Sequence, residues 1–168
     1  AALLPVVGAG VLTLGLALTG LTVGFSALGL VWTPYSPTAL SAADRLAGPS
    51  LAHPFGCDHM GRDVLSRTLS GAGATLSIAL AVLAIGFVVG VVIGALCGYY
   101  GGVVDAAVMR VCDAVAAFPS VLLGLVVIAV IGPGKYNVIL ALGVLFIPSF
   151  ARLTRGEFLQ YRDRDFIR

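Results

Sequence analysis

The sequence HPFGCDHMGRDVLSR, residues 53–67, gathers histidine, aspartate and arginine side chains between two long apolar runs. Residues 1–43 before it and residues 68–104 after it contain no Asp, Glu, Lys or Arg. Both runs exceed the roughly 20 apolar residues that a helix needs to cross the hydrocarbon core of a bilayer. The charged stretch (residues 53–67) is therefore expected to lie outside the membrane, between two spans.

The composition of the whole chain indicates that lipid is its solvent. Of the 168 residues, 59% are hydrophobic and 11% are charged, whereas a soluble domain carries about 25% charged residues. A water-soluble domain of this size could not bury so much apolar surface, because much of the surface of a small fold stays exposed. We expect an all-α membrane protein, built as a polytopic bundle of transmembrane helices.

The charge-free runs predict the organisation of the chain as one transmembrane domain over residues 1–168. The predicted spans cover residues 3–32, 72–98, 105–131 and 136–151. Residues 33–71 form the long polar connection, and residues 152–168 begin the segment after the last span. We expect Pro119 to kink the third span, because proline removes a helical hydrogen bond.

Glycine recurs at every fourth residue of the second span, at Gly86, Gly90, Gly94 and Gly98. Residues four apart lie on one helix face, and small residues there let a second helix backbone approach closely. Glycine is also frequent in general, at 22 of 168 residues, but the strict register favours a packed bundle. Gly86, Gly90 and Gly94 are thus candidates for helix packing or for a gate.

Charges near the third span are candidates for the same roles. Arg110 and Asp113 lie three residues apart on one helix face, where their side chains can pair. Charges at membrane depth should face protein or water. Together with Pro119, this pair is predicted either to line a gate or to join two crossing helices.

The basic residues predict the orientation in the membrane. The segment after the last span holds five arginines, and with Arg110 its side of the membrane holds six basic residues against four on the other. We therefore place residues 152–168 in the cytoplasm and residues 33–71 outside.

Neither catalysis nor metal binding is expected from the sequence. Four residues of the charged stretch are of types that can ligate a metal ion, namely His53, Cys57, Asp58 and His59. Their spacing matches no strong zinc pattern, and a Pro-Phe-Gly turn interrupts it. A Cys–His nucleophile pair would lack an orienting group and an oxyanion site. Residues 132–135, Gly-Pro-Gly-Lys, lack the spacing of a phosphate-binding loop. We predict no catalytic, cofactor-binding or metal-binding residues, and the net charge of +2 gives no indication of nucleic acid.

Several motifs in the same order resemble one transport family. Residues 53–67 resemble the signature HPxGTDxxGRDxxSR, and residues 98–119 resemble GYYGGxxDxxxMRxxDxxxxFP. Arg152-Leu153-Thr154-Arg155 continues the series. These phrases are similar to those of the C-type permease subunits of dipeptide, oligopeptide and nickel ATP-binding-cassette (ABC) importers. The resemblance extends over residues 32–168.

The resemblance implies a type I importer permease fold in the bacterial inner membrane. Four of six spans would be present, and the chain would end before the cytoplasmic "EAA" loop of the family. The implied function is not enzymatic: the chain would form half of the path for peptides or a related solute such as a nickel chelate. The implied partners are a homologous permease, two ATPase subunits that bind ATP and magnesium, an extracytoplasmic binding protein and membrane lipid. No nucleic acid partner is implied, and no cofactor is expected in this chain.

The resemblance also suggests roles for charged residues. Two roles remain open for Asp58, Arg62, Asp63 and Arg67. These residues could dock the binding protein, or they could be structural, for example as a salt-bridged cap on the second span. An approach to the ATPase contact is implied for Arg152, Arg155 and Glu157, although anchoring by positive charge explains the arginines equally well. Cys57 stands where the family usually has threonine, so a hydroxyl hydrogen bond there is in question.

Two other classes of function remain open at this point. The chain could belong to an ATP-independent channel or secondary transporter, or it could be a membrane scaffold that transports nothing. A dependence of solute uptake on ATP would separate the ABC importer from both.

Overall fold

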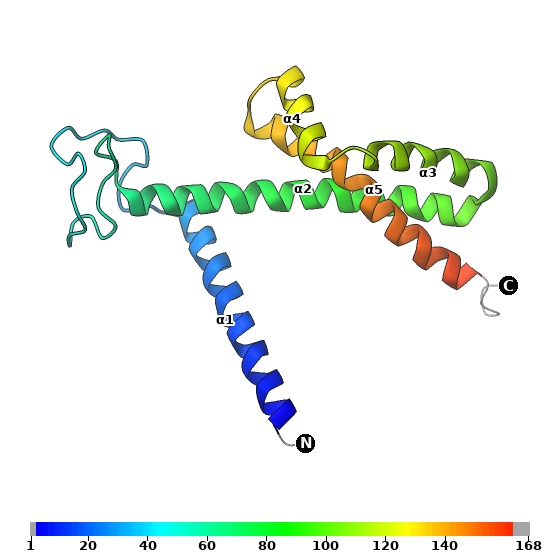
Figure 1. The fold of residues 1–168 in the computed structure, drawn as a ribbon, viewed down its shortest axis with the longest axis horizontal. Helices are drawn as coiled ribbons and strands as arrows, with labels where there is room; N and C mark the ends of the chain where they lie inside the picture. Colours follow the sequence, from blue (N-terminus) through cyan, green and yellow to red (C-terminus); the bar gives the residue numbers. More distant parts are fainter. Residues whose placement is uncertain (1–2, 163–168) are drawn as a thin grey trace. The chain divides into compact units, whose positions relative to one another are not determined.

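The computed structural model describes residues 3–162, with side chains from residue 10 to residue 161. Within these residues the chain forms the helices α1 (Leu3–Val31), α2 (Val64–Tyr100), α3 (Gly102–Ala116), α4 (Ser120–Ile131) and α5 (Lys135–Arg162) (Figure 1). Between residues 3 and 162 the only β-type pairing is an isolated bridge that joins Cys57 and Asp63. The prediction of an all-α polytopic membrane protein is confirmed.

The chain divides into two compact units, which we call the first unit (Ala1–Ser77) and the second unit (Ile78–Arg168). The helix α2 contributes its beginning to the first unit and its end to the second. The first unit also contains α1 and the connecting segment (residues 32–63), whereas the second contains α3, α4 and α5.

Three helices of the described chain are long and apolar enough to cross a membrane, over Gly10–Val31, Val64–Tyr100 and Lys135–Tyr161. A chain in lipid must satisfy its backbone hydrogen bonds internally, and these apolar sequences do so as helices. The pair α3 and α4 passes the same test together but bends by 87° at the break between them. Where the sequence indicated one kinked span over residues 105–131, the structure therefore has two helices.

Proline explains the break between α3 and α4. Pro119 precedes the first residue of α4, with φ −56° and ψ 118°. The ring of proline clashes with a helical conformation of the preceding residue, and its nitrogen has no hydrogen to donate. The helix α3 consequently ends at Ala116, and α4 starts in a new direction.

Two helices extend beyond the predicted spans. α2 begins at Val64 rather than near residue 72, and α5 continues past residue 151 to Arg162 through Pro148. The earlier start follows from a cap on α2, described below. Arg152 and Arg155, which were expected in the segment after the last span, thus lie on α5 and form ion pairs with residues of α3.

Glycine brings α2 and α5 into close contact in the second unit. Gly86, Gly90, Gly94 and Gly98 are all buried, and their Cα atoms lie against α5. A methyl group built on Gly90 would lie 2.6 Å from Cβ of Phe150 and 2.9 Å from the carbonyl oxygen of Ile147. A methyl group on Gly94 would meet the carbonyl oxygen of Ala151. Close packing of this kind depends on the absence of side chains.

The first unit uses the same device between α1 and α2. A Cβ on Gly73 would lie 2.9 Å from the backbone nitrogen of Leu30, and a Cβ on Gly29 would meet the backbone of Leu69. The connecting segment beside this crossing contains Gly56 and Gly61 at positive φ, 69° and 72°. Residues with a side chain rarely adopt a positive φ, whereas glycine adopts it at little cost.

Candidate functional site

Asp63 is the N-terminal cap of α2. Its Oδ2 atom accepts hydrogen bonds from the backbone nitrogen of Ser66 at 2.7 Å and from the Ser66 hydroxyl at 2.6 Å. The Asp63 residue is 4% exposed and the Ser66 residue is fully buried. A capping carboxylate satisfies one of the free N–H groups at a helix start and complements the positive end of the helix dipole. This cap fixes the start of α2 at Val64.

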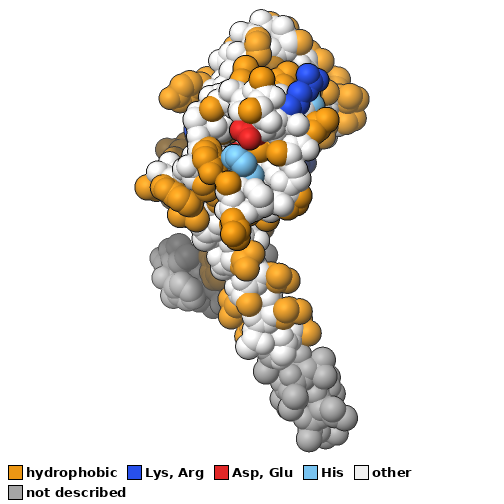
Figure 2. All heavy atoms as spheres, turned by 90° about the vertical axis from the view of Figure 1, so that its left-hand side faces the viewer, with side chains coloured by type: hydrophobic (Ala, Val, Ile, Leu, Met, Phe, Trp, Pro, Cys, Tyr) orange, Lys and Arg blue, Asp and Glu red, His pale blue; other side chains and the backbone are white. Residues whose placement is uncertain are grey.

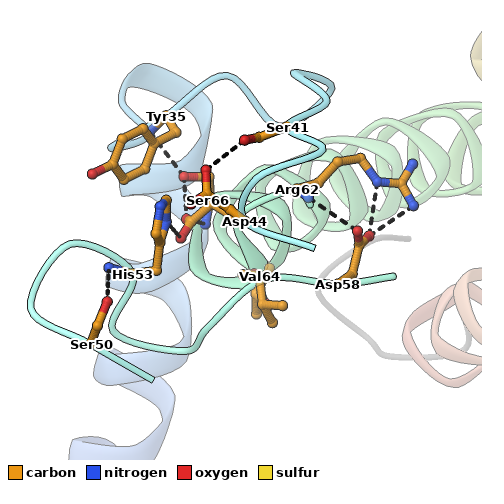
Figure 3. Close-up of polar contacts among 11 residues, drawn as sticks. Tyr35, Ser41, Asp44, Ser50, His53, Asp58, Arg62, Val64 and Ser66 are labelled. Carbon is orange, nitrogen blue, oxygen red and sulfur yellow. Dashed lines mark hydrogen bonds and ion pairs between the residues drawn. The ribbon is translucent and has the colours of Figure 1, made fainter. Parts of the chain in front are cut away.

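His53 and Tyr35 connect the rest of the segment to this cap (Figure 3). The His53 Nδ1 atom lies 2.9 Å from Oδ1 of Asp63, and its ring lies 4.7 Å from the ring of Tyr35. The backbone nitrogen of Tyr35 donates to the Ser66 hydroxyl oxygen at 3.0 Å. The His53 backbone nitrogen donates to the hydroxyl of Ser50 at 3.1 Å. Residues far apart in the connecting segment therefore converge on the first turn of α2.

Asp58 organises a second set of contacts, on the other side of the segment (Figure 3). Its carboxylate accepts hydrogen bonds from the backbone nitrogens of Met60 at 2.8 Å and Arg62 at 3.1 Å. It also pairs with the guanidinium groups of Arg62 at 2.8 Å and Arg67 at 2.9 Å. One carboxylate thus holds the turn and connects it to α2.

The surroundings of both carboxylates favour their charged forms. Desolvation raises the pKa of Asp58, but the N–H groups of Arg62 and Met60 and the Arg62 guanidinium outweigh it, so that the pKa falls from 3.8 to about 2. Burial likewise raises the pKa of Asp63, and hydrogen bonds from Ser66 and His53 reverse the effect and bring it below its usual 3.8. Hydrogen bonds to the ionised form are the cause in each case.

The lowered pKa of Asp58 predicts how the segment responds to acid. The folded-state pKa is below the unfolded one, so ionised Asp58 stabilises the folded segment above about pH 4, and this contribution is lost as the pH falls toward about 2. The carboxyl carbon of Asp58, observed by NMR in selectively labelled protein, should titrate near pH 2. In the Arg62→Gln variant its midpoint should move up toward 3.8. An equal midpoint in both proteins would contradict this account.

The exposed side of the charged stretch is an open groove. It has a volume of about 450 Å³ and is lined by Asp58, His59, Arg62, Val64, Arg67 and Thr68. Viewed from the side of the connecting segment, the surface shows small patches of acidic, basic and histidine side chains among apolar ones (Figure 2). The four residues for which docking or a structural role was open all make structural contacts, and docking stays a prediction.

A second group of charges joins α3 to α5. The guanidinium of Arg155 binds both carboxylate oxygens of Asp105, and Arg152 lies 3.4 Å from Asp113. The i, i+3 spacing indicated a pair of Arg110 with Asp113. Among the described residues, the ion pair of Asp113 is instead with Arg152 of the neighbouring helix. Glu157 is exposed further along α5.

The remaining gate candidates lie around the bend between α3 and α4. Pro119 is exposed at the bend, and a cavity of about 280 Å³ beside it is lined by Phe118 and Ser120 together with Pro148 and Arg152 of α5. Arg110 lines a neighbouring apolar depression that also includes Phe118. The structure thus brings Arg152 and the bend together, whereas the glycine stripe lies at the α2–α5 crossing.

Sequence reasoning missed several of these contacts. Asp63 followed by Ser66 at the head of an apolar run is a readable capping signal, but His53 as its partner has no local signature. The same holds for Asp105 with Arg155, which lie 50 residues apart. Their opposite charges near predicted span ends were the only available indication.

Comparisons with known proteins agree in pointing to transport. Residues 90–168 match the family described as binding-protein-dependent transport system inner membrane component. The chain is 41% identical over 135 residues to a glutathione transport system permease protein of Pectobacterium atrosepticum, an alignment that covers 80% of this chain and 45% of that protein. It is 47% identical over 120 residues to the protein of the same name from Escherichia coli, covering 71% of this chain and 40% of the relative. The aligned part is thus less than half the length of these relatives.

Proposed function

Because the chain belongs to the family of binding-protein-dependent transport system inner membrane components, we propose that it forms half of the solute path of an ABC importer. It is a multi-pass protein of the inner membrane and not an enzyme. In the proposed assembly a homologous permease supplies the other half of the path. Two ATPase subunits bind ATP and magnesium, and an extracytoplasmic binding protein delivers the solute.

The family match carries this proposal, and it falls on helices that pack closely against one another. Residues 90–168 include the end of α2 and all of α3, α4 and α5. In this unit, glycine packing joins α2 to α5 and ion pairs join α3 to α5. Helices joined in this way move together, and the 87° bend between α3 and α4 turns α4 away from the direction of α3. An importer that works by alternating access needs helices that move as rigid groups, so that the solute path opens first to one side of the membrane and then to the other.

The solute that we propose is a small peptide of the glutathione class. The support is the similarity to two glutathione permeases, at 41% and 47% identity. Glutathione is itself a tripeptide, so this class falls within the peptide substrates that the sequence motifs implied. A nickel chelate is a less favoured candidate, since neither of these relatives is named for nickel transport.

The test is solute uptake by reconstituted vesicles that contain the full-length chain, the partner permease, both ATPases and the binding protein. We expect labelled glutathione to enter only with ATP and the binding protein present, and to fall to background with a non-hydrolysable ATP analogue. A dipeptide and nickel, offered in parallel, identify the solute class. Uptake that is indifferent to ATP would favour a channel or secondary transporter and overturn the proposal.

A further inference from the structure

We propose that His53, Cys57 and Asp63 form a binding site for Zn²⁺, with one ligand atom from each side chain. One ring nitrogen of His53, the Cys57 sulfur and one carboxylate oxygen of Asp63 lie within 4.8 Å of one another. The sequence argued against a metal at His53, Cys57, Asp58 and His59, because their spacing matches no strong zinc pattern and a Pro-Phe-Gly turn interrupts it. In the structure Asp58 forms ion pairs with Arg62 and Arg67. The carboxylate that lies beside His53 and Cys57 is that of Asp63.

The backbone holds the three residues together without help from a metal. Cys57 and Asp63 form the isolated antiparallel bridge, which places their side chains side by side. The nitrogen of Gly56 donates to the carbonyl oxygen of His53 at 2.8 Å, and the nitrogen of Cys57 donates to the carbonyl oxygen of Ala47 at 2.9 Å. A cluster fixed by main-chain bonds requires little ordering when an ion binds.

The distances are close to those of a zinc site. Zinc–ligand bonds of about 2.0–2.3 Å place neighbouring ligand atoms of a tetrahedral site about 3.3–3.8 Å apart. The Nδ1 of His53 and Oδ1 of Asp63 lie 2.9 Å apart, so they need to separate by a few tenths of an ångström. The other separations, at most 4.8 Å, need to shorten by about 1 Å. The ion takes the place of the proton shared by His53 and Asp63, and the Cys57 thiol releases its own proton as the sulfur–zinc bond forms.

Neighbouring groups orient the ligands as they do in established metal sites. Ser66 binds the second oxygen of Asp63 through its hydroxyl and its N–H, which leaves Oδ1 for the ion. The Tyr35 ring contacts the His53 ring. Partners of this kind fix ligand geometry and typically contribute 10–100-fold to metal affinity.

The ligand types select the ion. A thiolate with an imidazole and a carboxylate suits Zn²⁺, whereas Mg²⁺ and Ca²⁺ prefer oxygen ligands alone. Cys57 and Asp63 are 8% and 4% exposed, but the His53 side chain is 18% exposed. An ion can therefore enter from the side of His53, and water completes its coordination. The bound ion would fasten residues 53–57 to the start of α2.

The test uses the full-length protein, with any affinity tag removed, dialysed against Zn²⁺ and assayed for bound metal by mass spectrometry. We expect one Zn²⁺ per chain and a loss of affinity of about 100-fold or more in Cys57→Ser, since a direct ligand contributes at least as much as its supporting groups. Cys97→Ser is the matched control, because Cys97 is also a buried free thiol and lies within α2, away from the proposed ligands. This variant should bind Zn²⁺ like the parent.

Cobalt provides a second measurement that does not depend on affinity. Co²⁺ bound in place of Zn²⁺ should show a thiolate-to-metal charge-transfer band, and the band should disappear in Cys57→Ser and persist in Cys97→Ser. His53→Gln serves as an additional ligand variant, and size-exclusion profiles establish that each variant is folded. Absence of stoichiometric zinc in the parent protein, or equal zinc in Cys57→Ser, would overturn the proposal. The outcome is independent of glutathione uptake and of the proposed transport function.

Discussion

Gly90→Ala in α2 is expected to destabilise the protein by about 1–3 kcal/mol, the usual cost of forcing an extra methyl group into a close-packed site. The added methyl group would lie 2.6 Å from Cβ of Phe150 and 2.9 Å from the carbonyl oxygen of Ile147. The second of these atoms belongs to the backbone of α5, so that no change of rotamer can relieve the contact. The two helices would have to move apart along their crossing.

Gly71→Ala is the matched control for this experiment, because it makes the same chemical change in the same helix. Gly71 is exposed, and no heavy atom outside its own helical surroundings lies within 4 Å of an added Cβ. We expect its stability to be unchanged or to rise by up to about 1 kcal/mol, since alanine favours helices over glycine. Thermal unfolding of the purified protein in detergent measures both variants. Equal midpoints for Gly90→Ala and Gly71→Ala would show that the glycine stripe does not support the α2–α5 contact.

The glycine positions illustrate how far the sequence could predict the fold. A repeat of four residues identifies a helix face that can be approached closely, but it does not name the partner helix. The partner, α5, is set by contacts with Phe150 and Ala151, which carry no distinctive pattern. Gly29 and Gly73 make an equally close crossing of α1 and α2, and no regular spacing marks them. The existence of packed helices was therefore predictable, whereas their pairing was not.

The charged residues also show that local features were predictable from the sequence and that their distant partners were not. Asp63 just before an apolar run is recognisable as a helix cap, because its preference arises from local backbone groups. The pairing of Asp63 with His53 depends instead on the path of the connecting segment, which turns at Gly56 with positive φ. The expected pair of Arg110 and Asp113 followed correct helical geometry, but Arg152 of α5 binds Asp113. Local rules predict which groups can pair, and tertiary packing selects among them.

Breaking the pair of Asp105 and Arg155 is the second change for which we expect a large effect. Arg155 binds both carboxylate oxygens of Asp105 through two nitrogens, and the side chains are 33% and 13% exposed, respectively. Exposed ion pairs contribute about 0–1 kcal/mol, whereas removal of one partner from a buried pair costs about 3–5 kcal/mol. The partial burial of this pair places the expected loss for Asp105→Asn or Arg155→Gln at about 2 kcal/mol.

A double-mutant cycle separates the contact from the general effect of each substitution. If the pair joins α3 to α5, Asp105→Asn combined with Arg155→Gln should cost much less than the sum of the single changes. The pair of Asp113 and Arg152 offers an internal control between the same two helices. Its atoms lie 3.4 Å apart and its side chains are 61% and 46% exposed, so the coupling there should be under about 0.5 kcal/mol. Additive losses at Asp105 and Arg155 would mean that the two charges act separately, and that this ion pair does not hold α3 on α5.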